Sequence, residues 1–238
     1  MSQLTVGFNP ATIELKDVVR LGMASDTKTL NDLANMLQDP NKRNQQYKKT
    51  IYPLFDTIAL NTAGAAISPA DFSFFTSESN TPSITNVNEN NSVPEGQVWL
   101  VYGLSWGLIG LSRTTNAGTI DRINFMDKAK GTVTVTMKNS SIIPLSGIPF
   151  EMIHCIQNYS GFVSQAVTTV GPSGSAAVVQ YVDSLNMSPD APSQNISPEL
   201  LLGKNKYSVK VHFEDTTDTF TNVLNLRLYL HAVIWTAM

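Results

Sequence analysis

Charged residues are scarce in this chain. Asp, Glu, Lys and Arg make up 15% of the 238 residues, whereas about a quarter is usual for a soluble protein. The formal net charge is -3 at pH 7, so the chain lacks the basic excess of dedicated nucleic-acid-binding proteins. We therefore expect no sequence-specific nucleic-acid binding. So low a fraction of charged residues favours the interpretation that the protein is a subunit of an assembly, in which neighbouring subunits cover much of its surface.

Cysteines and long apolar runs are also missing. The single cysteine, Cys155, has no partner in the chain for a disulfide or a cysteine zinc site, so the fold must be stable without them. No apolar run reaches the roughly 18 residues that a membrane-spanning helix needs. The first residues also lack the basic start and apolar core of a signal peptide. We expect a protein that is made in the cytoplasm.

Helical periodicity is confined to the first part of the chain. One short amphipathic helix is predicted after Thr12 as its cap, with apolar residues at Ile13, Leu15, Val18, Val19 and Met23. A second is predicted after Ser25 or Asp26 and before Asp39-Pro40, with apolar residues at Leu30, Leu33, Ala34 and Leu37. Residues 1–49 are therefore predicted to form an N-terminal helical arm that ends in a polar link.

The polar link is basic and contains Lys42, Arg43, Lys48 and Lys49. We interpret it first as a solvated connector. The alternative is that these residues dock the arm on lipid headgroups, on nucleic acid or on a neighbouring subunit.

The rest of the chain, residues 50–238, is predicted to be all-β. Strands are expected at residues 51–60, 71–76, 98–109, 119–125, 132–137, 142–145, 150–156, 162–170, 175–182, 207–213 and 224–235. Tight turns are expected at residues 128–131 and 171–174. With no helix between the strands, the pattern predicts an antiparallel jelly-roll sandwich. About eight main strands favour a single barrel; the alternative is a compact double jelly roll that divides near residues 145–160.

The longest strand pattern runs from Val98 to Ile109. Strict alternation predicts one bulky face and one face that includes small residues. The bulky face consists of Val98, Leu100, Tyr102, Leu104, Trp106 and Leu108, and the opposite face of Trp99, Val101, Gly103, Ser105, Gly107 and Ile109. We expect Leu100, Tyr102, Leu104 and Trp106 in the core, with the small residues allowing a second layer or subunit to approach.

Catalytic signatures are weak. The residues Gly103-Leu104-Ser105-Trp106-Gly107 match the G-x-S-x-G pattern of esterases, but that motif needs a strand that turns into a helix at the serine. Here the strand pattern continues, so we interpret Ser105 as structural and expect no enzyme activity.

Metal and cofactor signatures are equally weak. The three histidines are His154, His212 and His231, and we interpret them as half-exposed strand residues rather than metal ligands. The acidic residues Glu214, Asp215 and Asp218, and the acidic loop 183–190, leave loop calcium as an alternative. No cofactor is predicted.

The order of these features resembles the jelly-roll capsid proteins of tailless icosahedral bacteriophages with an internal membrane, of the corticovirus, tectivirus and finnlakevirus type. The resemblance covers residues 50–238 and rests on the segments DFSFFT, VPEGQVWLVYGLSW, GTVTVTMKNSSIIPL, KYSVKVHF and LNLRLYLHAVIW, with an Asn-rich tract between the first two.

That resemblance implies a virion shell subunit. It would form trimeric capsomers, contact neighbouring capsomers and other virion proteins, and turn its N-terminal arm toward the internal membrane lipids. The competing interpretation is a carbohydrate- or receptor-binding sandwich, such as a vertex, spike or lectin-like module with aromatic stacking platforms.

Overall fold

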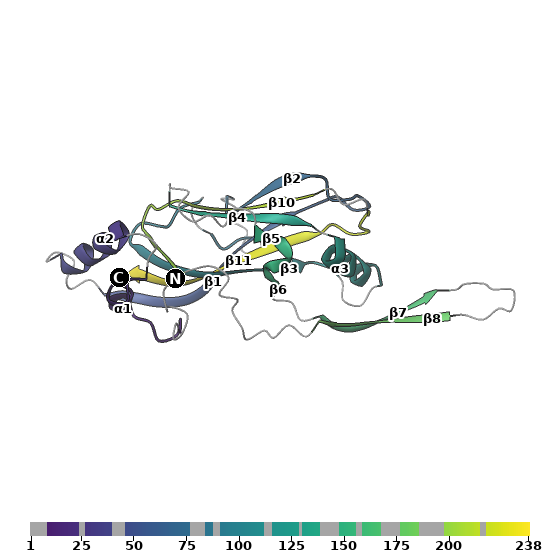
Figure 1. The fold of residues 1–238 in the computed structure, drawn as a ribbon, viewed down its shortest axis with the longest axis horizontal. Helices are drawn as coiled ribbons and strands as arrows, with labels where there is room; N and C mark the ends of the chain where they lie inside the picture. The colour runs from purple at the N-terminus through teal and green to yellow at the C-terminus, as the bar shows by residue number, and fades with distance from the viewer. Residues whose placement is uncertain are drawn as a thin grey trace.

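The computed structural model has two β-sheets packed face to face, with few helices (Figure 1). The predicted all-β sandwich is thereby confirmed. The structure describes residues 9–23, 27–39, 46–76, 84–87, 91–111, 116–128, 130–138, 148–155, 159–167, 177–185, 198–214 and 218–238. The predicted strand at residues 142–145 lies outside these ranges.

The first sheet is built around two strands of thirteen residues, which pair with each other over nearly their whole length. Its members, in order, are β1 (Tyr47–Ala59), β11 (Asn225–Ala237) and β3 (Gln97–Ile109), with β9 (Glu199–Leu202) and β6 (His154–Cys155) both beyond β3. Among the described strands, β1 lies at an edge, which suits Pro53 because proline cannot donate a hydrogen bond to a further strand.

The second sheet lies above the first in Figure 1 and is shorter. Its strands, in order, are β2 (Ala70–Phe74), β10 (Tyr207–Phe213), β4 (Gly131–Met137) and β5 (Ile148–Pro149). The predicted alternation is confirmed in β4, where Val133, Val135 and Met137 are buried. Strands from before and after residues 145–160 share each sheet, as in the pairs of β1 with β11 and of β4 with β10.

A separate hairpin consists of β7 (Tyr159–Val167) and β8 (Ala177–Leu185). These strands pair in the region where the sequence predicts a hairpin. In Figure 1 the hairpin extends away from the two sheets. Within the described parts of the chain, it forms a two-stranded sheet of its own.

The prediction of a strand at residues 119–125 was wrong, because this segment belongs to the helix α3 (Asn116–Lys128). Among the α3 side chains that the structure describes, the buried residues are Gly118, Asp121, Arg122 and Phe125, which are spaced at i, i+3, i+4 and i+7. Two of these residues are charged, so the helical period is invisible in a hydrophobicity pattern. The predicted tight hairpin at residues 128–131 was wrong for the same reason.

Buried polar contacts explain why charged residues face inward on α3. The carboxylate of Asp121 accepts hydrogen bonds from the backbone N–H groups of Thr221 and Asn222, at 3.0 and 2.8 Å. The Arg122 guanidinium donates to the carbonyl of Leu111. These bonds fix α3 to the segments that follow β3 and precede β11.

The predicted strand at residues 150–156 is broken into short pieces. A 3-10 helix, η1 (Phe150–Met152), separates β5 from β6. This turn places Phe150 in an aromatic cluster at the centre of the sandwich. Its ring centroid lies 5.0 Å from those of Trp106 and Phe213, and Phe125 packs edge-on against it at 6.0 Å.

The faces predicted for the long strand needed one correction, because β3 contains a bulge. Gly103 pairs with His231 and Val101 with Ala232, so Tyr102 is an extra residue without an opposite partner. Consequently Leu104 and Trp106 point into the core between the sheets, whereas Leu100 and Tyr102 point to the outer face of the first sheet. All four predicted core residues are buried, but in two separate clusters.

Candidate assembly surface

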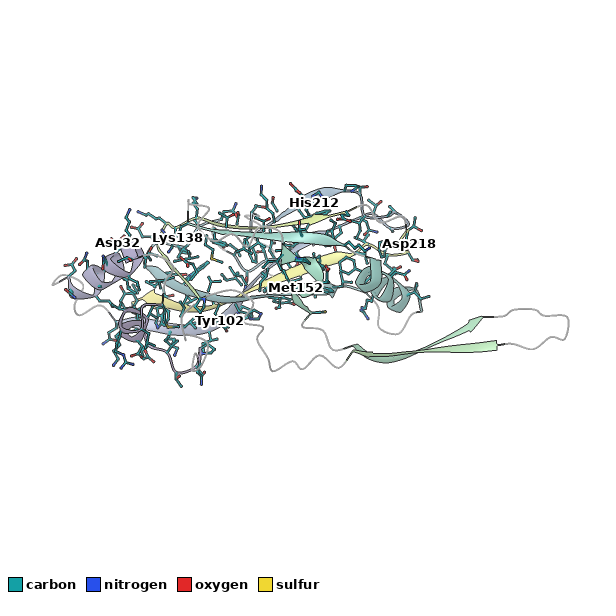
Figure 2. The ribbon with its side chains drawn as sticks, viewed as in Figure 1. Asp32, Tyr102, Lys138, Met152, His212 and Asp218 are labelled. Atoms are coloured by element: carbon teal, nitrogen blue, oxygen red, sulfur yellow. The ribbon has the colours of Figure 1, made fainter. Side chains whose placement is uncertain are left out.

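The outer faces of the two sheets differ in chemistry. On the second sheet the outward residues of β2, β10 and β4 are polar and exposed or half-buried: Asp71, Ser73, Thr132, Thr134, Thr136, Ser208, Lys210 and His212. A face of this composition is suited to exposure to solvent. On the first sheet the outward residues are largely apolar or aromatic. Figure 2 shows Tyr102 and His212 on these opposite sides of the sandwich.

One end of the outer face of the first sheet is covered by the two N-terminal helices, α1 (Leu15–Arg20) and α2 (Thr27–Gln38). Both helices lie where the sequence predicts them. The buried residues of this second cluster are Ile13, Leu15, Val18, Met23, Leu33, Val98, Leu100, Tyr102, Leu200, Val233 and Trp235. The described parts of the arm, residues 9–23 and 27–39, are therefore packed on their own sandwich.

The start of α1 differs from the prediction in its cap. Glu14 occupies the N-cap instead of Thr12, and it forms a capping box in which the Asp17 carboxylate accepts from the Glu14 backbone N–H at 3.2 Å.

The four basic residues of the predicted link have different positions. Lys42 and Arg43 lie outside the described residues. Lys48 and Lys49 belong to β1, which begins at Tyr47, four residues before the predicted strand. Lys48 is exposed, but Lys49 donates a hydrogen bond to the Ala11 carbonyl at 2.8 Å and lies 3.7 Å from the Glu14 carboxylate. Lys49 thus fastens the arm to β1.

Beyond the helices, the outer face carries a group of residues that we call the aromatic strip. It consists of Ile51, Phe55, Arg227, Tyr229 and His231, all exposed or half-buried on β1 and β11. Their neighbours on β3 are Gly103, Ser105 and Gly107. The strip has one formal positive charge, Arg227, and it is otherwise neutral when His231 is neutral.

The aromatic strip is held in place by local contacts. The Arg227 guanidinium lies 4.4 Å from the centroid of the Phe55 ring, a cation–π contact, and its Nε donates to Thr57 Oγ1 at 2.7 Å. The Tyr229 ring packs 6.2 Å from Phe55. These contacts arrange two rings and a cation on one face of the sheet, which is a suitable surface for contact with another protein.

The G-x-S-x-G serine lies beside this strip. Ser105 is fully buried, and its Oγ shares a 2.7 Å hydrogen bond with His231 Nε2. The strand continues through Ser105 to Ile109, so the strand-turn-helix geometry of a nucleophile elbow is absent at this residue. Sequence reasoning did not foresee the pairing with His231, because 126 residues separate the two.

The Ser105→Ala variant tests the structural interpretation of this serine. We expect the free energy of unfolding to fall by about 1 kcal/mol, because one buried hydrogen bond is lost. Hydrolysis of ester substrates by the purified variant should equal that of the wild type. A loss of turnover confined to the variant would contradict the interpretation.

Two further findings concern the predictions on metals and membranes. Within the described ranges, no three His, Cys, Asp or Glu side chains lie close enough together to hold a metal ion. Asp215, one of the residues considered for calcium, is not among those described. None of the described helices is long and apolar enough to span a membrane.

The chain matches no protein-family model, and no curated protein matches its sequence. The fold and its surfaces therefore carry the functional proposal.

Proposed function

We propose that this protein is a structural, non-enzymatic shell subunit of a virion, built as a single jelly roll. One observation carries the proposal, which is the nested pairing of the strands. The first strand pairs with the last, β1 with β11; then β2 pairs with β10, β3 with β9, and β4 with β5, all antiparallel.

Nested pairing is what a long antiparallel hairpin gives when it is wrapped into a barrel. The additional pairs of β11 with β3 and of β10 with β4 complete the two sheets. Successive strands of the nested order lie in alternate sheets, except that β4 and β5 share one. Eight strands in two such sheets are the jelly-roll arrangement of viral capsid and lectin domains. The short β6 and the β7–β8 hairpin lie outside the nested order.

Two further observations favour a shell subunit over a lectin. One outer face is polar, whereas the other carries the aromatic strip, so the subunit has distinct sides for solvent and for contact. The low fraction of charged residues, 15%, suits a surface that neighbours cover. The resemblance to capsid proteins of membrane-containing bacteriophages implies three further features. The subunit would form trimeric capsomers, contact other virion proteins and be located in the virion.

The role of the arm is part of this proposal. Residues 9–23 and 27–39 pack on the subunit itself, so the contact with membrane lipids or neighbouring capsomers is assigned to Lys42, Arg43 and Lys48. Lys49 is excluded from this role because it bonds to Ala11 and Glu14 in its own chain.

Imaging of the purified full chain by negative-stain electron microscopy, together with its mass by light scattering, tests the proposal. We expect trimers that associate into sheets or closed shells as the protein concentration rises. Dispersed monomers at every concentration would contradict the proposal. Monomers that also bind a glycan array would support the carbohydrate-binding alternative, for which Phe55 and Tyr229 offer stacking surfaces.

A further inference from the structure

One edge of the first sheet is formed by the long strand β1. It pairs with β11 from Tyr47 to Ala59 without a shift of register, and no other described strand pairs with β1. The residues of a strand direct their N–H and C=O groups alternately to its two sides, so every second residue of β1 directs them away from β11. Such an edge is a template for pairing with another chain unless its backbone groups are occupied.

Half of this edge, around Phe55, is closed by bonds within the subunit. The Phe55 N–H donates to Asn86 Oδ1 at 2.6 Å, and the Phe55 carbonyl accepts from the Asn86 N–H at 3.2 Å. The side-chain amide of Asn86 also donates to the carbonyl of Pro53 at 2.9 Å, and proline has no N–H to offer. The Thr57 N–H donates to the Asp56 carboxylate at 2.9 Å. This half of the edge is therefore protected from a further strand.

The other half of the edge is open. Because Phe55 faces outward, the alternation places the backbone groups of Ile51, Lys49 and Tyr47 outward as well. Among the described residues, none bonds to these outward N–H and C=O groups. The Ile51 side chain beside them is 44% exposed. Free donors and acceptors next to an exposed apolar side chain are suited to a strand from another molecule.

We propose that this open edge, residues 47–51, pairs with the same edge of a second copy, so that the first sheets of two subunits become continuous. Antiparallel pairing centred on Lys49 sets Tyr47 of each copy opposite Ile51 of the other, and a ring opposite a β-branched side chain is a favourable cross-strand pair. A centre one residue later would set Tyr47 opposite Pro53, and a centre one residue earlier would set Ile51 opposite a residue that precedes β1. Only the Lys49 centre gives all three outward residues a partner.

The charges along the edge are compatible with this register. Lysines on an edge strand usually discourage pairing, and like charges directly opposite each other are destabilising. However, the Lys49 side chain is only 18% exposed, because its Nζ donates to the Ala11 carbonyl at 2.8 Å and lies 3.7 Å from the Glu14 carboxylate. Two Lys49 side chains would thus meet together with two Glu14 carboxylates. On the other face of the strand, Lys48 would lie opposite Thr50 and not opposite a second lysine.

The inference rests on the proposed shell function and names the contact that joins one capsomer to the next. Pairing of identical edges is isologous and has two-fold symmetry. A three-fold contact alone ends at the trimer, whereas trimers joined by two-fold contacts extend into a sheet or close into a shell. The paired edge has five residues, whereas a stable interface has about 20–30 residues a side. Each contact is therefore weak, but the three contacts of a trimer act together.

The first experiment blocks the open edge with Ile51→Pro. This change removes an outward N–H and leaves the bonds to β11 in place, as Pro53 does in the wild type. Ala59→Pro is the matched control, because Ala59 is exposed and also faces outward, but it lies beyond the closed half of the edge. Light scattering over a range of protein concentrations measures association, and urea unfolding shows whether each variant is folded. We expect Ile51→Pro to stop at trimers, while Ala59→Pro associates into sheets or shells like the wild type.

A folded Ile51→Pro protein that associates like the wild type would overturn the inference and leave the shell proposal standing. Wild-type trimers that never associate further would also overturn it. A wild-type chain that remains monomeric at every concentration would instead refute the shell function itself.

The second experiment traps the pairing in the wild-type edge and does not depend on the proline variant. In the proposed register residues 48 and 50 of the two copies form a non-hydrogen-bonded pair, whose Cα atoms are about 4.5 Å apart, within the range of about 4.4–6.8 Å that a disulfide spans. Both side chains are exposed, and the native Cys155 is buried. The double variant Lys48→Cys, Thr50→Cys should form dimers on non-reducing gels after mild oxidation, and a reductant should reverse them.

Each single variant is a control for the register. Lys48→Cys alone and Thr50→Cys alone should remain monomeric on the same gels, because residue 48 lies opposite residue 50 and neither lies opposite itself. Single variants that cross-link as well as the double variant would refute this register. A double variant that associates but does not cross-link would refute the edge pairing.

Discussion

Replacing Trp106 by alanine should lower the free energy of unfolding by about 3–5 kcal/mol. Trp106 is almost fully buried between the sheets, and its ring packs on Phe150 and Phe125 at centroid distances of 5.0 and 5.6 Å. Its Nε1 donates to the Ile153 carbonyl at 2.9 Å, so the substitution also leaves that buried carbonyl without its donor. Assembly should be lost together with the fold.

Urea denaturation followed by the fluorescence of the two remaining tryptophans, Trp99 and Trp235, measures this effect. Met152→Ala is the matched control, because Met152 lies in the neighbouring turn η1 but is 69% exposed. It should change the unfolding free energy by less than about 0.5 kcal/mol. A Trp106→Ala protein as stable as the control would mean that the aromatic cluster is not the centre of the core.

The Asp56→Ala variant should lose about 2–4 kcal/mol of unfolding free energy at pH 7. The Asp56 carboxylate is buried and accepts hydrogen bonds from the backbone N–H groups of Phe75 and Thr57, at 2.6 and 2.9 Å. Phe75 is buried and has a φ of 61°, a conformation that residues other than glycine seldom adopt. Without the carboxylate, the segment that follows β2 loses the bond that holds this conformation.

The pH dependence of this loss follows from the direction of the pKa shift. Burial raises the pKa of Asp56 above its usual value of 3.8, more than its hydrogen bonds to Phe75, Thr57 and Thr85 and the nearby Arg227 lower it. The folded chain therefore holds the proton more tightly than the unfolded chain. The stabilisation from this shift is fully present below pH 3.8 and is lost as the pH rises through the raised pKa.

Unfolding curves of the wild type and the Asp56→Ala variant, measured from pH 7 down to the lowest pH at which both fold, test this sign. The difference between the two proteins should grow as the pH falls. A difference that shrinks would show that hydrogen bonding outweighs burial at this carboxylate. Asp71→Ala serves as the control, because Asp71 is an exposed acid whose ion pair with His212 is worth at most about 1 kcal/mol.

Local sequence pattern predicted those elements in which one face is apolar throughout. In β10, Tyr207, Val209, Val211 and Phe213 alternate with polar residues, because one side of the strand meets the core and the other meets water. In α2, the apolar residues follow the helical period for the same reason. Alternation of this kind is a local property, so it can be read without knowing which strands become neighbours.

The hydrophobic pattern failed to predict the structure in two places: where buried residues are charged, and where both faces of a strand are apolar. In α3 the inward face contains Asp121 and Arg122, whose side chains bond to backbone groups outside the helix. In β3 both faces are apolar, because the N-terminal helices cover one end of the outer face, and this hid the bulge at Tyr102. Neither the partner of Asp121 nor the cover over β3 can be inferred from the neighbouring residues.

The sequence by itself determined that this protein is a β-sandwich with two N-terminal helices, because period and turn residues act within a few positions of each other. Only the tertiary structure decided which strands pair, and hence the nested order behind the shell proposal. It also brought Phe55 beside Arg227 and Tyr229 to form the aromatic strip, although more than 160 residues separate β1 from β11. Strand pairing joins residues by register across the whole chain, and no local pattern specifies that register.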